Sequence, residues 1–331
     1  MLPAIPPGDE ALRRLVDEYR ARCLWFLGRE YYPETTEEVL RVLDSIQRHG
    51  DVGAFKRAGE LKRWALTSSS ATSASSSQKT GSGTARATAG GATLNELIGA
   101  PRLSRDLDVF HDTEMALTAS WRDDRASLEG AGYEVRVFRE RSGFVEADIR
   151  RGGDSVLMQW ARDSAYRFFP LVQHPELGLT LHPFDLATSK VLALVGRVEP
   201  RDFVDTLSCD RHVQPLGYLA WAACGKDPGF SPSGILEEAG RANRHSEAEL
   251  RGLDFDGARP DARELSLAWR AQIETARLVV AMLPAEQAGR AVLDRTGRLF
   301  RGDPDALCEA LHGDQLVYHP GSIRGALPHF V

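Results

Sequence analysis

Hydrophobic residues recur at helical spacing through the first 66 positions of the chain. A first helix is predicted over residues 9–27 and a third over residues 52–66. Between them, Thr35 and Glu38 form the pattern of a capping box, in which two side chains satisfy the free amides of a helix start. A second helix should therefore run from there towards Gly50, and residues 1–66 should form an N-terminal helical region.

The composition changes abruptly over residues 67–84, which read TSSSATSASSSQKTGSGT. Almost every side chain in this stretch is small and polar, so the stretch cannot bury enough apolar surface to fold by itself. It is predicted to be a flexible linker.

Residues 85–180 alternate between helical and extended patterns. A short helix over 92–98 should be followed by a strand over 107–110 and a helix over 113–129. Three strands are then predicted over 133–140, 144–150 and 156–161. In the middle one, apolar Val145, Ala147 and Ile149 alternate with Glu146 and Asp148, which places the two sets on opposite faces of a sheet.

The pattern is helical again from Pro183, with loops near 226–233 and 254–261. Residues 181–331 are thus expected to form a mainly helical C-terminal domain. Helices on both sides of a strand-rich segment favour an α+β fold.

Composition and charge restrict the classes of protein to which this fold can belong. A hydrophobic content of 42% over 331 residues is enough to fill real cores, and no apolar stretch approaches the roughly 20 residues of a membrane helix. The N-terminus does not resemble a secretory signal, which favours a cytoplasmic protein that contacts no membrane. The net charge of −6 allows nucleic acid to bind only at a local basic site.

The four cysteines are far apart and include no CxxC pair, which argues against a zinc site or a disulfide framework. We expect them to be reduced residues that contribute to packing. They are Cys23, Cys209, Cys224 and Cys308.

Candidate chemistry begins at Gly90 and Gly91, which precede a predicted helix. A glycine pair at a helix start lets a phosphate chain approach free backbone amides. Asp106 and Asp108 follow in a predicted strand, and their i, i+2 spacing places both carboxylates on one face, where they can hold Mg²⁺. Each piece alone is common in loops and on surfaces, but the order of the pieces is that of a nucleotidyltransfer site of the polymerase-β type.

A second group of charges lies downstream. Lys190 and Arg197 are two helical turns apart on an otherwise apolar helix, so both can face one phosphate. Arg201, Asp202 and Asp205 follow directly after Pro200, where another helix should begin. Buried salt bridges among these groups are the competing interpretation.

These segments together resemble a known family. Four segments are similar in order and spacing to the motifs of AbiEii/AbiGii-type nucleotidyltransferases, the toxins of toxin–antitoxin and phage-defence modules. The segments are GGATLNELIG, RLSRDLDVF, DLATSKVLALVGR and RDFVDTL. The resemblance covers roughly residues 89–207. It implies a polymerase-β-like core with a mixed sheet, in which a magnesium-dependent enzyme transfers nucleotides from a nucleoside triphosphate, in studied relatives to the tRNA 3′ end. It also implies an antitoxin protein as a possible partner.

The resemblance also implies roles for individual residues. Asp106 and Asp108 would hold the metal, Lys190 would contact phosphate, and Asp202 would complete the catalytic set. The glycine pair would bind the nucleotide together with three further residues. Ser104 would lie beside the nucleotide, and Arg197 and Arg201 would give electrostatic support.

Two features depart from the family pattern. The segment before Gly90, residues 84–89, is weakly apolar, so the leading strand is expected to be irregular or poorly anchored, with reduced activity as a consequence. A third carboxylate is common on a later strand, but the matching strand offers Gln159. The candidates for that carboxylate are Glu146, Asp148 and Asp163.

Other functions remain open from the sequence. The chain has no GxSxG motif, and its histidines, including His111 after the aspartate pair, lie near no nucleophile motif, which argues against a hydrolase. A non-catalytic protein could use the same fold to bind tRNA or a partner. A transferase acting on a small molecule or a protein hydroxyl is a further alternative, because the acceptor leaves no motif.

Overall fold

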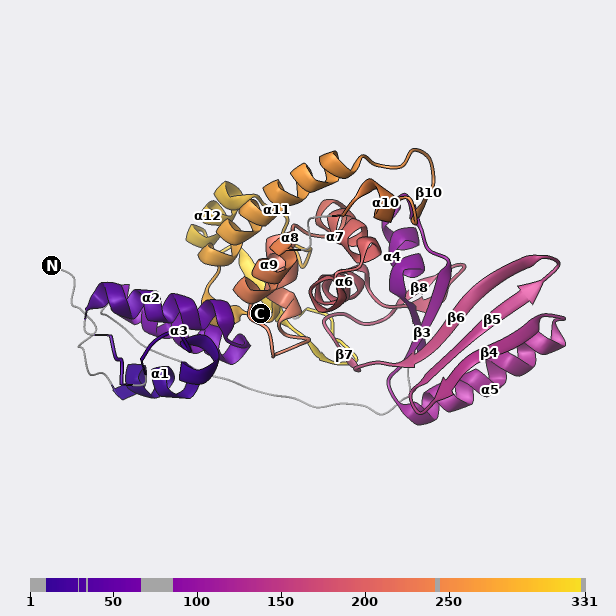
Figure 1. The fold of residues 1–331 in the computed structure, drawn as a ribbon, viewed down its shortest axis with the longest axis horizontal. Coiled ribbons are helices and arrows are strands. Elements are labelled where there is room, and N and C mark those ends of the chain that lie inside the picture. Colours follow the sequence, from indigo (N-terminus) through magenta and orange to yellow (C-terminus); the bar gives the residue numbers. More distant parts are fainter. Residues whose placement is uncertain (1–9, 29, 34, 67–85, 242–244, 329–331) are drawn as a thin grey trace.

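The computed structural model describes residues 10–28, 30–33, 35–66, 86–241 and 245–328. The predicted linker, residues 67–84, lies outside the described residues. Three helices lie at one end of the molecule and a sheet backed by one helix lies at the other, with the remaining helices between them (Figure 1). Within the described residues, no helix is both long enough and apolar enough to cross a membrane.

The N-terminal helices form a unit with its own core. The predicted capping box is present, because the Glu38 amide donates to Thr35 Oγ1 at 3.2 Å and the Thr35 amide donates to Glu38 Oε2 at 3.1 Å. The unit rests on the C-terminal helices, where Ser231 Oγ donates to the Gln47 carbonyl at 2.7 Å. Its helices are α1 (Glu10–Cys23), α2 (Thr36–His49) and α3 (Val52–Leu66).

A seven-stranded mixed sheet forms the other end, which confirms the α+β prediction. In order across the sheet, the strands are β4 (Glu134–Arg141), β5 (Phe144–Arg151), β6 (Asp154–Arg162), β3 (Asp106–His111), β1 (Arg86–Ala89), β9 (Gly178–Thr180) and β8 (Val172–His174). The neighbours β6 and β3 run parallel, whereas β3 and β1 run antiparallel.

The outer half of this sheet is covered on one face. Helix α5 (Glu114–Gly130) lies against β4–β6, and the apolar positions of those strands pack onto its Leu117 and Trp121 (Figure 1). The predicted alternation in β5 is confirmed, since Val145, Ala147 and Ile149 all point into this small core.

The expectation of a poorly anchored strand before Gly90 is wrong. Strand β1 lies inside the sheet, where all four residues from Arg86 to Ala89 pair with β3 and Thr88 pairs with Thr180 of β9. Ala87 and Ala89 are buried, so their small side chains fit a crowded interior rather than indicating weak packing.

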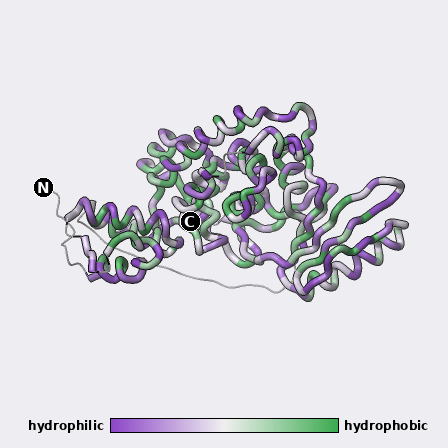
Figure 2. Tube along the Cα trace, in the orientation of Figure 1, coloured by the Kyte–Doolittle hydropathy of each residue, from purple (hydrophilic) through white to green (hydrophobic). Residues whose placement is uncertain are grey.

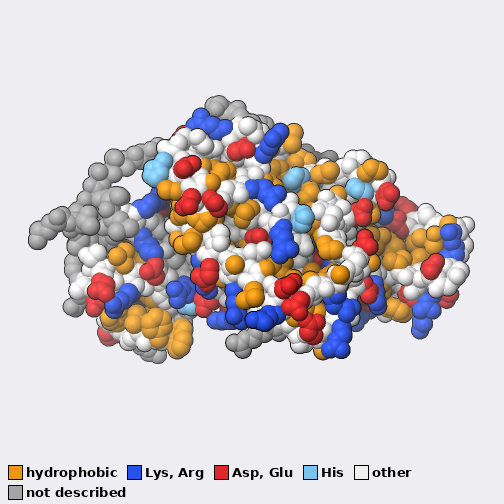
Figure 3. Space-filling model, turned by 90° about the horizontal axis from the view of Figure 1, so that it is seen from above, with side chains coloured by type: hydrophobic (Ala, Val, Ile, Leu, Met, Phe, Trp, Pro, Cys, Tyr) orange, Lys and Arg blue, Asp and Glu red, His pale blue; other side chains and the backbone are white. Residues whose placement is uncertain are grey.

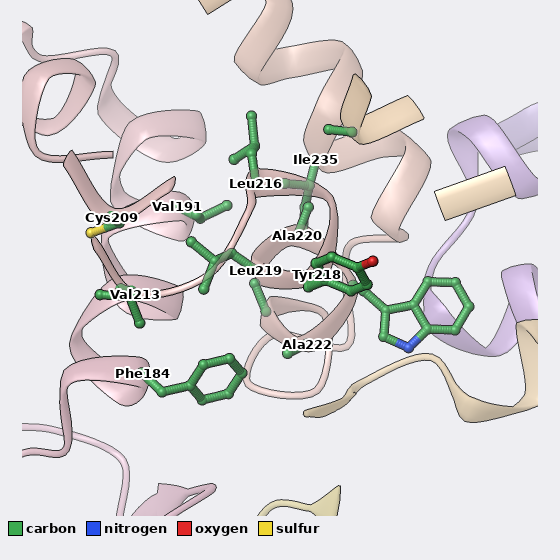
Figure 4. Packing of buried hydrophobic residues seen from close by; sticks show 14 of the residues in the cluster. Phe184, Val191, Cys209, Val213, Leu216, Tyr218, Leu219, Ala220, Ala222 and Ile235 are labelled. Carbon is green, nitrogen blue, oxygen red and sulfur yellow. The ribbon is translucent and has the colours of Figure 1, made fainter. Parts of the chain in front are cut away.

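Helices fill the centre of the molecule, and their apolar residues form the largest core (Figure 2). The short helix α8 is buried along its whole length and packs against side chains of its neighbours, including Phe184, Val191 and Ile235 (Figure 4). The helices are α4 (Gly90–Ile98), α6 (Pro183–Arg197), α7 (Pro200–His212), α8 (Leu216–Ala223), α9 (Pro232–Arg241), α10 (Glu247–Leu250), α11 (Ala262–Met282) and α12 (Pro304–His312), with a 3₁₀ turn at Ala285–Gln287.

Three small antiparallel pairs join distant parts of the chain, and the sequence pattern did not predict them. Each pair joins short segments that are separated in the sequence, so no local pattern identifies the partners. The pairs are β2 (Arg102–Leu103) with β10 (Asp254–Phe255), β11 (Arg290–Asp294) with β12 (Leu316–Pro320), and β7 (Tyr166–Arg167) with β13 (Ser322–Ile323).

The cysteines are free thiols. Cys23, Cys209 and Cys224 are buried and contribute to packing as expected, whereas Cys308 is exposed.

The central core makes a stability prediction. Leu219 is fully buried in α8, so Leu219→Ala should lower the free energy of unfolding by about 2–5 kcal/mol, measured by chemical denaturation. Leu278→Ala is the matched control, because that side chain is 57% exposed on α11 and its loss should change the free energy of unfolding by less than about 0.5 kcal/mol. Equal losses in the two variants would contradict this assignment of the core.

Candidate functional site

The glycine turn between β1 and α4 lies directly against the aspartate pair. Gly90 has a φ of 77°, in the left-handed region that favours glycine. A Cβ atom at this position would lie only 1.7 Å from Asp108 Oδ2, so no other residue fits without moving the carboxylate. The helix start has no side-chain cap, because its N-cap residue is Ala89. The first amides of α4 therefore have no side-chain acceptor at the cap, as a phosphate site requires.

Asp106 and Asp108 extend from the same face of β3. Both are partly buried, and Ala89 at the end of β1 pairs with Asp108 across the sheet. Burial raises the pKa of the Asp108 carboxyl, and the nearby charge of Asp106 adds to this effect. Lys190, Arg201 and Arg197 lie close enough to lower the same pKa. The structure thus brings the two predicted charge groups together at one site.

Two of the three cations are partly exposed at this site. Arg201 Nη1 lies 3.3 Å from Asp106 Oδ2, and 39% of its side chain is exposed. Arg197 has 48% of its side chain exposed and donates to Asp202 through Nε at 2.6 Å and Nη2 at 3.0 Å. Both guanidinium groups are therefore within reach of a ligand that enters from solvent.

Lys190 differs, because it is buried between two carboxylates. Its Nζ lies 3.0 Å from Asp202 Oδ1 and 3.0 Å from Asp205 Oδ2. Burial alone would raise the pKa of Asp202, but the hydrogen bonds and charges of Arg197 and Lys190 together hold it below its ordinary value. The buried salt bridges that the sequence offered as the competing interpretation are thus present, and contact between Lys190 and phosphate stays a prediction.

Asp205 is the residue of this region whose importance the sequence analysis missed. Its fully buried carboxylate accepts two hydrogen bonds from Arg102, from Nε at 2.6 Å and Nη2 at 2.9 Å, and one from Asn95 Nδ2 at 3.2 Å. The available signal was an aspartate on the apolar stretch of α7, with Val204 before it and Leu207 after it. Its arginine partner could not be found from sequence, because about a hundred positions separate the two.

Ser104 lies beside the second glycine of the turn. A Cβ atom on Gly91 would be 3.4 Å from Ser104 Oγ and 2.4 Å from Arg102 Nη2. The turn is therefore crowded on both sides, by Asp108 at Gly90 and by Arg102 at Gly91.

The candidates for a third carboxylate separate into two groups. Glu146 and Asp148 of β5 share the sheet face of the aspartate pair, because Gln159 and Leu157 of β6 lie between them in register. Glu146 is not beside Asp108; Gln159 occupies that place and donates to Glu146 Oε1 at 3.0 Å. Asp163 lies beyond the other end of β3, where its amide bonds to the His111 carbonyl. It is therefore remote from the pair.

The donor set fits a single hard cation. Within the described part of the chain, no group of three or more His, Cys, Asp or Glu side chains could hold a metal. Magnesium, however, is commonly held by one or two carboxylates together with phosphate oxygens and water. Asp106 and Asp108 supply that pair, and the guanidinium of Arg201 already lies against Asp106.

On the face of the molecule seen in Figure 3, neither sign of charge dominates. Acidic and basic side chains are interspersed over the face shown in Figure 3. The cations around the aspartate pair are thus a local arrangement, as the net charge of −6 requires.

Comparison with known proteins gives one similarity. No family model matches the chain, and no curated protein matches it. Among solved structures, it is similar to MenT4, a nucleotidyltransferase toxin from Mycobacterium tuberculosis H37Rv, at a TM-score of 0.40 and 15% sequence identity, over 74% of this chain and 90% of that one. At this level the similarity carries no argument about activity, substrate or partner.

The glycine turn generates a prediction about both stability and geometry. Gly90→Ala should lower the free energy of unfolding by more than Gly99→Ala, because both residues are left-handed but a Cβ at Gly99 meets nothing within 4 Å. The control should lose about 1–2 kcal/mol from backbone strain alone, and chemical denaturation of the two variants measures the difference. Equal losses would mean that Gly90 is not pressed against Asp108.

Proposed function

We propose that this protein is a magnesium-dependent nucleotidyltransferase that transfers nucleotides from a nucleoside triphosphate to an acceptor. The observation that carries the proposal is the contact between the Gly90 turn and Asp108, with Asp106 on the same face of β3. A tight glycine turn with uncapped amides beside a pair of like charges is costly to maintain in a purely structural protein, so this arrangement favours a ligand-binding role.

The residues of the site suit phosphoryl chemistry. Such reactions depend on positioning and charge neutralisation rather than on a protein nucleophile. The amides at the start of α4 and the guanidinium groups of Arg197 and Arg201 bind and orient the triphosphate. Asp106 and Asp108 would hold Mg²⁺, which supplies charge neutralisation on the phosphate oxygens when bound. Ser104, which lies beside Gly91 in the turn, would contact the nucleotide.

Lys190 and Asp202 are buried, and they act on the groups that contact the ligand. Lys190 contributes positive charge near Asp108 while it is held by Asp202 and Asp205. Asp202 in turn orients the exposed Arg197 through two hydrogen bonds. The pair therefore positions the groups that meet the ligand.

The acceptor and the biological setting rest on the family resemblance of the sequence motifs. On that basis we infer a cytoplasmic, toxin-like transferase that modifies the tRNA 3′ end and is paired with an antitoxin protein. Transfer to a small molecule or to a protein hydroxyl is the alternative within the same chemistry.

The first test concerns the aspartate pair. Asp106→Asn and Asp108→Asn should each abolish nucleotide transfer, because each removes half of the carboxylate charge while preserving side-chain volume. The assay is incorporation of labelled nucleoside triphosphates into total RNA with magnesium, with and without EDTA. Asp123→Asn on the exposed surface of α5 is the control and should retain full activity.

Full activity in either site variant would refute the metal assignment. If the wild-type protein transfers nothing to RNA, protein or small-molecule acceptors yet still binds RNA, the non-catalytic alternative is correct.

The second test separates the exposed cation from the buried one. Arg201→Gln should raise KM for the triphosphate about tenfold, the loss expected for one charged hydrogen bond, and leave the free energy of unfolding nearly unchanged because its ion pair is partly exposed to solvent. Lys190→Met should instead lower the free energy of unfolding by about 3–5 kcal/mol, since two buried carboxylates each lose the cation that they share. Titration and chemical denaturation of both variants measure this contrast, and the reverse pattern would exchange the two roles.

A further inference from the structure

A β-bulge in β4 changes which side chains face the aspartate side of the sheet. Regular alternation along EVRVFRER would place Arg136 on one face and both Arg139 and Arg141 on the other. The register shifts between Val137 and Arg139, so that Arg136 opposes Asp148 while Arg139 opposes Glu146 and Arg141 opposes Phe144. Since opposed residues share a face, all three arginines lie on the same face of the sheet.

This face is the one that carries the aspartate pair. Two rows of paired residues cross the four strands from β3 to β4, and each begins at an aspartate and ends at an arginine. One row runs Asp108, Gln159, Glu146, Arg139, and the other runs Asp106, Leu157, Asp148, Arg136. Three strand spacings separate the ends of each row, which is about 14 Å.

The arginines are exposed, and the carboxylates between them are not. Arg139 and Arg150 have 63% and 47% of their side chains exposed, whereas their partners Glu146 and Asp148 have 13% and 9%. Glu146 and Asp148 thus hold the guanidinium groups of Arg139 and Arg150 in place from the buried side. Among the described residues, no carboxylate lies within ion-pair distance of Arg136 or Arg141, so both of those cations are uncompensated.

The opposite face of these strands is covered by α5, but no helix of the described residues covers this one (Figure 1). Phe138, the unpaired residue of the bulge, is 50% exposed, and the Arg136 guanidinium lies 5.5 Å from its ring centre. Glu134, opposite Arg150, marks the end of the basic stretch. We call the surface formed by Arg136, Phe138, Arg139, Arg141 and Arg150 the arginine platform.

We propose that the arginine platform binds the acceptor of the reaction as a single strand of nucleic acid, whose end then reaches Asp106 and Asp108. The inference rests on the proposed function. Because of the bulge, successive arginines of β4 oppose every second residue of β5, a repeat of roughly 7 Å that is comparable with that of phosphates along an extended strand. An exposed aromatic ring beside them offers a base a stacking surface, as in proteins that bind single strands without strong sequence preference. The exposed ring favours nucleic acid over an acidic polypeptide, whose carboxylates offer no base to stack on it.

The test measures binding in the absence of metal and triphosphate, so that catalysis plays no part. A fluorescein-labelled 20-nucleotide single-stranded RNA is titrated with the full-length protein in EDTA and followed by fluorescence anisotropy at several salt concentrations. The double variant Arg136→Gln/Arg139→Gln should weaken binding about tenfold and reduce the slope of log Kd against log salt by about 1.4, the value for two lost phosphate contacts.

The control is Arg122→Gln/Arg125→Gln on α5, beyond the opposite face of the sheet. It removes the same charge and is closely matched, because Arg125 pairs with Glu129 and lies over Trp121 much as Arg139 pairs with Glu146 and Arg136 lies over Phe138. Thermal unfolding of both variants checks that each is folded. The control should bind RNA as the wild type does.

Three outcomes decide between the possibilities. Unchanged RNA binding in the platform variant, or equal loss in the control, would overturn the platform. Competition by polyglutamate as effective as that by RNA would assign the surface to an acidic protein and overturn it as well. Platform-dependent RNA binding by a wild-type protein that transfers no nucleotide would support the platform and refute the proposed function.

Discussion

The carboxylate of Asp205 ties together the elements on which the candidate site is built. It has no exposed surface, and it meets Arg102 before β3, Asn95 of α4 and Lys190 of α6. Through Lys190 the network continues to Asp202 and then to Arg197 at the surface. Removing one member of such a buried set leaves the other charges without partners, which is costly. The sheet and the helices therefore hold the glycine turn and the aspartate pair in one arrangement because these charges must be satisfied together.

This network also divides the cations of the site by depth. Lys190 is a compact charge enclosed by carboxylates, whereas the side chains of Arg197 and Arg201 are partly exposed to solvent. Long planar guanidinium groups suit the outer position, since they can hold a carboxylate with one edge and offer the other to a phosphate. Asp108 therefore has positive charge near it on its buried side, from Lys190, and on its solvent side, from Arg197 and Arg201.

Much of the local structure could be predicted from sequence, because it depends on short-range patterns. The Thr35–Glu38 capping box, the alternation in β5 and the i, i+2 placement of Asp106 and Asp108 all follow from neighbouring residues. Features set by distant partners could not be found in this way. Strand β1 looked weak because its alanines are small, yet both are buried and the strand pairs with a neighbour on each side. The partnership of Arg102 with Asp205 and the register shift in β4 likewise depend on the folded sheet.

The two faces of β3 belong to different cores. Val109 packs with α5 and the outer strands, whereas Phe110 packs with the central helices. The α5 core shares no residue with the larger one, so substitutions on the outer strands need not disturb the half that contains the glycine turn. If the protein is the transferase proposed above, a chain divided in this way could change its acceptor over evolutionary time by altering one lobe, while the residues around the glycine turn stay fixed.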